Sequence, residues 1–267
     1  MSVIVTNENN RFILSNSSRD HVTYNFFRFS NNGILLNLDI SILNAQKDIL
    51  LVCSVRNDND LIEMLFVIEK LHHLKIDVLL MYFHFCRADD GVNFMANLLK
   101  NAGVRHITSV DMHTPHKHIH NISMEKFWSN FINDKYVIVA PDKGAVLRNG
   151  SLYHLNLFKE RSNNTVTATW DGNVLDIKGK DCMIVDDMID TGKTLIAASD
   201  FLTAKGAGSV SVCATHAVLS ENASQLIQNS RNIEQVHVTD TIEHKNLPNK
   251  YQVTPIFEYI LAELKYI

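Results

Sequence analysis

Three aspartates stand close together near residue 190, immediately before a turn of small residues. The segment contains Asp186, Asp187 and Asp190, followed by Thr191, Gly192, Lys193 and Thr194. Ionised carboxylates only accept hydrogen bonds, so they suit sugar hydroxyls or a magnesium ion that bridges to them. The residues after them suit a phosphate, because hydroxyls donate hydrogen bonds and a glycine lets the backbone approach closely. Together these residues predict a site for a phosphorylated ribose.

This acidic segment lies where a strand is expected to end and a helix to begin. Residues 182–185 form a short apolar run, typical of a buried parallel strand, and apolar residues then recur at helical spacing over 195–202. Ligands of open α/β sheets bind at the carboxyl ends of strands, and a helix N-terminus offers free N–H groups to an anion. We therefore expect the aspartates to bind ribose hydroxyls and residues 191–194 to bind the phosphate.

The segment differs from a Walker-type phosphate loop, although Gly192, Lys193 and Thr194 match the end of that motif. No glycine stands five residues before Gly192, where the motif requires one. An acidic turn that only complements a helix dipole would need fewer carboxylates than the three present here. The ribose-phosphate interpretation is therefore favoured over both alternatives.

Composition and charge argue against several other classes of protein. The chain has 267 residues, of which 46% are hydrophobic and 20% charged, enough for one large or two modest domains with a substantial core. A net charge of −4 and a pI near 6.3 argue against nucleic acid or a membrane as partner. The four cysteines lack CxxC spacing, and neither a targeting signal nor a membrane-spanning run stands out. We therefore expect a cytoplasmic protein with reduced cysteines.

Apolar runs and helical patterns alternate along the chain. Strands are expected at residues 49–55, 78–85, 106–111, 136–140, 182–185, 209–215 and 235–238, with helices at 61–74, 92–102 and 195–205. Such alternation predicts an α/β protein with parallel sheets, in two similar domains at 1–122 and 123–267. The final helix is expected to pack back on the first domain. The polar segment 159–176 predicts a mobile loop followed by a hairpin.

Histidines and a further aspartate follow other expected strands. His113 follows one strand and Asp142 another, and an imidazole with a carboxylate can hold a divalent cation that binds nucleotide phosphates. Taken alone, His113 is more often structural. The string His116, His118 and His120 is more typical of a solvated loop than of a zinc site.

Lys159 and Arg161, separated by one residue, lie in the expected mobile loop. Two such cations could close over a transferring phosphoryl group and neutralise the charge of its transition state. On its own, the pair is more simply interpreted as a solvated charge cluster. Arg87 and Asp89 follow another expected strand, where the arginine could contact an anion.

Taken in order, segments along nearly the whole chain resemble the ribose-phosphate diphosphokinases, the phosphoribosyl diphosphate (PRPP) synthetase family. The segments are 27–30 (FRFS), 57–64 (NDNDLIEM), 82–89 (YFHFCRAD), 96–99 (ANLL) with 102–103, 110–113 (VDMH), 140–142 (APD), 186–194, 215–216 (TH) and 238–242 (VTDTI). The phosphoribosyltransferases share only the 186–194 motif and the fold of the second half. They are therefore the weaker resemblance.

The resemblance implies a phosphoribosyltransferase-like fold and a magnesium-dependent transfer. The β,γ-diphosphoryl group of ATP would pass to the anomeric hydroxyl of a ribose 5-phosphate moiety, releasing AMP. The implied roles are ATP binding by Phe29, Arg87, Asp89 and His113, metal binding by His113 and Asp142, and catalysis by His113, Lys159 and Arg161. The resemblance also implies a homo-oligomer of at least two subunits.

The chain departs from the family pattern at several positions. Asn31, Asn32 and Gly33 stand where the family has Asp-Gly-Glu in its ATP-contacting motif, and Ala88 stands in place of a glutamine. Lys193 stands where the family has a small residue, and the added cation would suit a diphosphate or a 5′-substituted ribose such as ADP-ribose. The sequence leaves open ribose 5-phosphate or ADP-ribose as acceptor, a phosphoribosyltransferase, and a non-catalytic regulatory relative.

Overall fold

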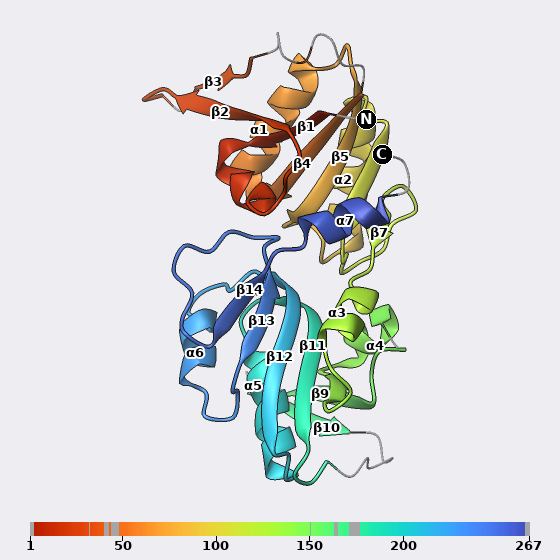
Figure 1. Ribbon diagram of the computed structural model, residues 1–267, viewed down its shortest axis with the longest axis vertical. Coiled ribbons are helices and arrows are strands. Elements are labelled where there is room, and N and C mark those ends of the chain that lie inside the picture. The colour runs from red at the N-terminus through yellow and green to blue at the C-terminus, as the bar shows by residue number, and fades with distance from the viewer. Residues whose placement is uncertain are drawn as a thin grey trace. The chain divides into compact units, whose positions relative to one another are not determined.

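The protein is described by a computed structural model covering residues 3–31, 33–39, 43, 48–149, 151–162, 165–170 and 177–264. It divides into two compact units, coloured red to yellow-green and green to blue in Figure 1 apart from short returning segments. Unit 1 comprises Met1–Ile122, Thr241–Glu243 and Pro255–Ile267, and unit 2 comprises Ser123–Asp240 and His244–Thr254. Asn32, one of the positions that depart from the family pattern, lies outside the described residues, as do residues 163–164 and 171–176 of the expected loop and hairpin.

Unit 1 contains a seven-stranded sheet in the order β3-β2-β1-β4-β5-β6-β7. Its strands are β1 (Val3–Asn7), β2 (His21–Arg28), β3 (Ile34–Asn37), β4 (Asp48–Val55), β5 (Lys75–Phe83), β6 (His106–Val110) and β7 (His120–Ile122). Its helices are the 3-10 helix η1 (Glu8–Leu14), α1 (Asp58–Lys70), α2 (Asp89–Asn101) and α7 (Phe257–Glu263). The β2–β3 pair is antiparallel, whereas the other neighbours are parallel.

Unit 2 contains a second seven-stranded sheet, in the order β10-β9-β8-β11-β12-β13-β14. Its strands are β8 (Val137–Ala140), β9 (Leu155–Ser162), β10 (Thr165–Trp170), β11 (Asp181–Ile189), β12 (Ser209–Ala217), β13 (Val236–Thr239) and β14 (Tyr251–Thr254). Its helices are α3 (Glu125–Phe131), α4 (Lys143–Asn149), α5 (Lys193–Ala204) and α6 (Ala223–Asn229). Only the β9–β10 hairpin is antiparallel among these described strands. The expected α/β class with two mainly parallel sheets is confirmed.

Local sequence explains why these elements form. In β4 nearly every residue is buried, as expected of a central parallel strand covered by helices on both faces. Helix α1 begins after Asn57, whose side chain accepts a hydrogen bond from the backbone N–H of Asp60. Its buried positions include Leu61, Met64 and Ile68, which follow the helical period.

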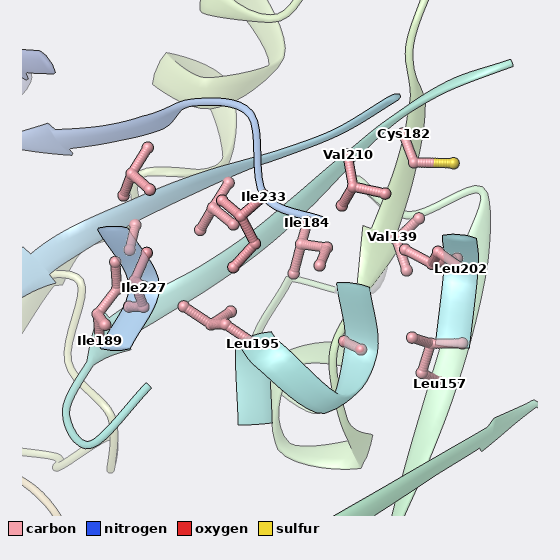
Figure 2. Close-up of a cluster of buried hydrophobic side chains, with 14 of the residues drawn as sticks. Val139, Leu157, Cys182, Ile184, Ile189, Leu195, Leu202, Val210, Ile227 and Ile233 are labelled. Carbon is pink, nitrogen blue, oxygen red and sulfur yellow. The ribbon is translucent and has the colours of Figure 1, made fainter. Parts of the chain in front are cut away.

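The core of unit 2 lies between its sheet and helices α5 and α6 (Figure 2). Leu195 and Leu202 of α5 are seven residues apart and are both almost completely buried. They pack in the same cluster as Ile184 of β11 and Val210 of β12, and Ile227 of α6 completes it. This packing holds the first turn of α5 against the carboxyl end of β11.

The prediction of a mobile loop is wrong for the first residues of segment 159–176, because Lys159 and Arg161 belong to strand β9. Their backbones pair with Ala168 and Val166 of β10, in an antiparallel hairpin. The polar composition of this stretch suggested a loop, but the β-branched residues that follow favour a strand. Leu155 and Leu157 at the start of β9 are buried, but the charged residues 159–161 lack the apolar run used to recognise buried strands. The expected strand 78–85 also ends earlier, with β5 stopping at Phe83.

The final helix, α7, groups with unit 1 although unit 2 precedes it in the chain. Its Glu258 accepts a hydrogen bond from the Ser17 hydroxyl at 2.5 Å. Residues 241–243 also group with unit 1, and the Ser54 hydroxyl of β4 donates to the carbonyl of Thr241 at 2.7 Å. The chain therefore contributes to unit 1 from both of its ends.

Candidate functional site

The acidic pair of the 186–194 segment lies within strand β11 rather than after it. Asp186 and Asp187 occupy its carboxyl-terminal part, and the strand continues to Ile189. Asp187 is only 2% exposed, whereas Asp186 is partly exposed. The backbone N–H of Asp187 donates to Oδ1 of Asp186 at 2.9 Å, which fixes one carboxylate relative to the next residue. Two carboxylates are thus held at the sheet edge where α/β proteins bind ligands.

An arginine that the sequence analysis did not single out bridges this pair. Nη2 of Arg148, on helix α4, lies 2.8 Å from Oδ1 of Asp186 and 2.7 Å from Oδ1 of Asp187. The side chain of Arg148 is only 12% exposed. Helix α4 spans seven residues, too few for a helical period to reveal which residues face the sheet. No local signal in the sequence pointed to this contact.

The charges of the cluster perturb one another. Burial and the neighbouring Asp187 raise the pKa of Asp186 well above its usual range, and Arg148 opposes this rise. Burial alone would lower the pKa of Arg148, but the carboxylates of Asp187, Asp186 and Asp142 outweigh it and raise the pKa. Such coupling between buried charges is typical of functional sites, although structural ion pairs show it too.

The turn after β11 presents an open helix N-terminus. Asp190 and Thr191 are partly exposed in this turn, and Gly192 at the N-cap of α5 has φ +74. Lys193 is the first residue of α5 and is exposed, and Thr194 follows it, half-buried. Among the described residues, no side chain caps this end of α5. The first N–H groups of a helix have no partner within the helix, so this turn suits an anion.

The turn after β8 adjoins strand β9 in the same sheet. Oδ1 of Asp142 accepts a hydrogen bond from the N–H of Ala145 at 3.1 Å, which starts helix α4. Nζ of Lys143 lies 5.0 Å from the ring centre of Phe158 in β9. Since β8 pairs with β9 only as far as Asn156, the rest of β9 extends past the carboxyl end of β8. The backbones of Lys159 and Arg161 belong to this extension.

The expected nucleotide residues of unit 1 follow three strands of its sheet. Arg87 and Asp89 are exposed after β5, and half-buried His113 follows the adjacent strand β6. Phe29 follows β2, which β1 and β4 separate from β5. Phe29 is 50% exposed, and its ring centre lies 5.0 Å from that of Phe27. Arg87 and His113 thus follow neighbouring strands, whereas Phe29 follows a strand that is separated from the nearer of these by two others.

Two backbone features shape the turns that carry Arg87 and His113. A Cβ on Gly91 would lie 2.5 Å from the carbonyl oxygen of Phe85, so only glycine lets α2 approach this turn. Asp111, buried between β6 and His113, has φ +44, a left-handed conformation that is strained for a residue other than glycine. Such strain is often retained at functional sites.

The candidate metal ligands do not form a ready-made metal centre. His113 belongs to unit 1 and Asp142 to unit 2. Within the described ranges, no three His, Cys, Asp or Glu side chains are grouped so that they could hold a metal ion. Magnesium is usually held by one or two carboxylates together with substrate phosphates, rather than by a cage of protein ligands. The partly exposed carboxylate of Asp142 fits such a shared site.

The protein has two mainly parallel sheets, and the sheet of unit 2 carries the acidic end of β11 next to the uncapped N-terminus of α5. These features define a phosphoribosyltransferase-type α/β fold. The phosphoribosylpyrophosphate synthetase of Mycobacterium smegmatis shares this fold, with a TM-score of 0.77 over 98% of this chain and 97% of that one, at 24% identity. Residues 167–256 match the family model described as phosphoribosyl synthetase-associated domain.

Relatives of higher identity show the family itself. A ribose-phosphate pyrophosphokinase of Thermosipho africanus is 33% identical over 236 residues, covering 76% of this chain and 73% of the relative. That of Campylobacter jejuni is 31% identical over 272 residues, covering 89% of this chain and 86% of the relative. The chain therefore belongs to the ribose-phosphate pyrophosphokinase family of kinase-type transferases.

Among the helices that the structure describes, none is both long and apolar enough to cross a membrane.

Proposed function

We propose that this protein transfers the β,γ-diphosphoryl group of ATP to the anomeric hydroxyl of ribose 5-phosphate, giving PRPP and AMP. The acceptor oxygen would bond to the β-phosphorus of ATP, the bond from that phosphorus to the oxygen bridging to the α-phosphorus would break, and the hydroxyl proton would be lost. The observation that carries this proposal is the pairing of Asp186 and Asp187 at the end of β11 with the uncapped first turn of α5. Membership of the pyrophosphokinase family supports it.

The acceptor would bind at the carboxyl edge of the unit 2 sheet. Asp186, Asp187 and Asp190 would accept hydrogen bonds from the ribose hydroxyls, which donate to ionised carboxylates. The 5-phosphate would lie against residues 191–194, where the backbone N–H groups, the threonine hydroxyls and the dipole of α5 all favour an anion. Gly192 supports this placement, because its left-handed backbone forms the turn directly before the first N–H groups of α5.

The nucleotide would bind to residues of unit 1. Arg87 would contact the phosphates as a cation, and the exposed ring of Phe29 offers a surface on which adenine could stack. Asp89 begins helix α2 directly after this arginine and would contact the nucleotide beside it. His113, on the neighbouring strand end, would contact the triphosphate and its metal. These four roles rest on the resemblance to the family.

The transferring group would be neutralised by cations of strand β9. Lys159 and Arg161 lie in the part of β9 that extends past β8, on the same side as the turn of Asp142. Transfer between two polyanions needs charge neutralisation and positioning more than covalent chemistry. The contact of Lys143 with Phe158 supports placing this extension beside the Asp142 turn.

Magnesium is the expected metal, with Asp142 and His113 on the protein side. Asp142 supplies an oxygen ligand of the kind that magnesium prefers. When bound, magnesium would neutralise charge on the β- and γ-phosphates of ATP. We also propose that the protein forms a homo-oligomer, which light scattering of the purified protein would detect.

The function is tested by incubating the protein with ATP, magnesium and ribose 5-phosphate, then measuring AMP release and the mass of the product. Formation of PRPP and AMP in equal amounts is expected. Lys159→Ala should abolish most of this turnover, whereas Lys180→Ala should not. Lys180 is an exposed lysine of the same unit that directly precedes the amino end of β11, away from the candidate site.

Further arms of the assay separate the alternatives that the sequence left open. AMP release with ADP-ribose but not with ribose 5-phosphate would overturn the proposed acceptor. Consumption of PRPP with a nucleobase, without AMP formation from ATP, would indicate a phosphoribosyltransferase. No turnover with any acceptor, in both wild type and Lys159→Ala, would indicate a regulatory relative.

A further inference from the structure

The contact of Arg148 with the acidic pair has a geometry that a plain surface ion pair lacks. One nitrogen, Nη2, donates to both Asp186 and Asp187, at 2.8 and 2.7 Å. The three side chains are between 1% and 12% exposed, so solvent screens their charges little. Two neighbouring buried carboxylates repel each other, and a cation between them offsets that repulsion.

The side chain of Arg148 lies beside the turn that follows β8. A Cβ on Gly144 would lie 3.0 Å from Nη1 of Arg148 and 3.1 Å from Oδ1 of Asp142. The absence of a side chain at Gly144 therefore leaves room for the guanidinium beside the Asp142 carboxylate. Arg148 lies between the Asp142 turn, on the proposed metal side, and the carboxylates of the proposed acceptor site.

The guanidinium of Arg148 is held by two carboxylates, but one of its hydrogen-bond donors is left without a partner among the described residues. Nε of Arg148 is buried and has no hydrogen-bond partner in the part of the chain that the structure describes. A buried donor without a partner costs stability. Stability alone gives little reason for an arginine here, since a buried ion pair often stabilises a protein no more than well-packed apolar side chains do. This combination favours a functional reason for the contact.

We propose that Arg148 is a positioning residue for the acceptor. By bonding Oδ1 of both Asp186 and Asp187, it fixes the two carboxylates side by side, in one orientation for accepting hydrogen bonds from adjacent ribose hydroxyls. Side chains that orient the ligands of a metal typically change its affinity, or the activity, by about ten- to a hundredfold when they are removed, and we expect an effect of the same order for Arg148. The inference rests on the proposed function, because it takes the ribose of ribose 5-phosphate as the ligand of this pair.

The test compares Arg148→Met, Arg148→Lys and Arg231→Met with wild type. Arg231 is an exposed arginine of the same unit, after α6 and before β13, and serves as the matched control. Two readouts are measured: binding of ribose 5-phosphate alone by calorimetry, and the KM values for ribose 5-phosphate and ATP. Unfolding in urea reports the stability of each variant.

Arg148→Met is expected to weaken ribose 5-phosphate binding and raise its KM by about ten- to a hundredfold, with a smaller change in the KM for ATP. Arg148→Lys should recover part of the loss, because it keeps the charge but not the planar fork. A folded Arg148→Met protein with wild-type affinity for ribose 5-phosphate would overturn the role. If that variant does not fold, a change of less than about twofold in Arg148→Lys overturns it.

Failure of the proposed function gives a different result. Wild-type protein would then bind no ribose 5-phosphate and release no AMP, so no variant would be needed. Active wild-type protein with unchanged affinity in the Arg148 variants would overturn only the positioning role.

Discussion

A Cβ atom on Gly192 would lie 2.9 Å from Cδ1 of Ile227, so helix α6 packs directly against the turn that opens α5. Gly192 also has φ +74, which side chains other than glycine rarely adopt. The turn proposed to bind phosphate is therefore shaped by a neighbouring helix as well as by its own sequence.

Gly192→Ala is expected to destabilise the protein by about 1 to 2 kcal/mol through the left-handed backbone, and to weaken ribose 5-phosphate binding. Gly179→Ala is the matched control, because Gly179 has φ +71 but no atom within 4 Å of the added Cβ. Urea unfolding and calorimetry check both effects. Gly192→Ala is expected to lose at least as much stability as Gly179→Ala, because its Cβ must also displace the side chain of Ile227, and only Gly192→Ala should lose binding. Wild-type stability in Gly192→Ala would contradict the backbone argument.

Asp186→Asn is expected to raise the free energy of unfolding at neutral pH by about 0.5 to 2 kcal/mol while removing activity. Burial and the neighbouring Asp187 raise the pKa of Asp186. The folded protein therefore binds this proton more tightly than the unfolded chain, and stability falls as pH rises from about 4 through the raised value. Asparagine cannot ionise but can still accept a hydrogen bond from Arg148.

Unfolding of Asp186→Asn, measured between pH 4 and pH 8, should show a smaller decrease with pH than wild type does. Asp181→Asn, at the amino end of the same strand, should retain wild-type turnover and serves as the control. If the free energy of unfolding depended on pH equally in wild type and Asp186→Asn, the electrostatic argument would be contradicted.

Lys159→Ala and Arg161→Ala should each lower kcat by about a hundred- to a thousandfold, the effect of losing one group that stabilises transition-state charge. Both variants are expected to remain folded, because the role proposed for these cations is in the transfer and not in folding. Steady-state kinetics and urea unfolding check the two effects, with Lys180→Ala as control. If either variant lost its fold, the residues would instead be needed to build the β9–β10 hairpin.

Lys193→Ala should separate acceptor binding from stability. Lys193 is the first residue of α5, where a cation opposes the helix dipole, so its removal should stabilise the protein by about 0.3 to 1 kcal/mol. The same change should raise the KM for the phosphorylated acceptor by about ten- to a hundredfold, since a charge-assisted hydrogen bond to phosphate is worth about 1.5 to 3 kcal/mol.

Lys205→Ala, at the C-cap of the same helix, is the matched control for Lys193→Ala. A cation there favours the helix, so the opposite sign of stability change is expected with an unchanged KM. An unchanged KM in Lys193→Ala with every acceptor tested would show that this lysine does not contact the ligand.

Local sequence was enough to predict a strand before the turn and a helix after it, although β11 continues through the acidic pair to Ile189. An apolar run before the acidic pair and a helical period after Gly192 both act over short distances, and both appear as β11 and α5. The alternation of such units likewise predicted two mainly parallel sheets. The same reasoning failed for β9, because its buried apolar pattern is limited to Leu155 and Leu157 and does not continue into the charged residues 159–161.

The partner of the acidic pair was decided by tertiary structure alone. Arg148 lies 38 residues before Asp186 in the sequence, on a helix too short to show a period. The contact arises because β8 and β11 are neighbours in the sheet, so that α4, which follows β8, meets the end of β11. Sequence spacing shows which residues share one strand or helix, whereas the order of strands determines which buried charges meet.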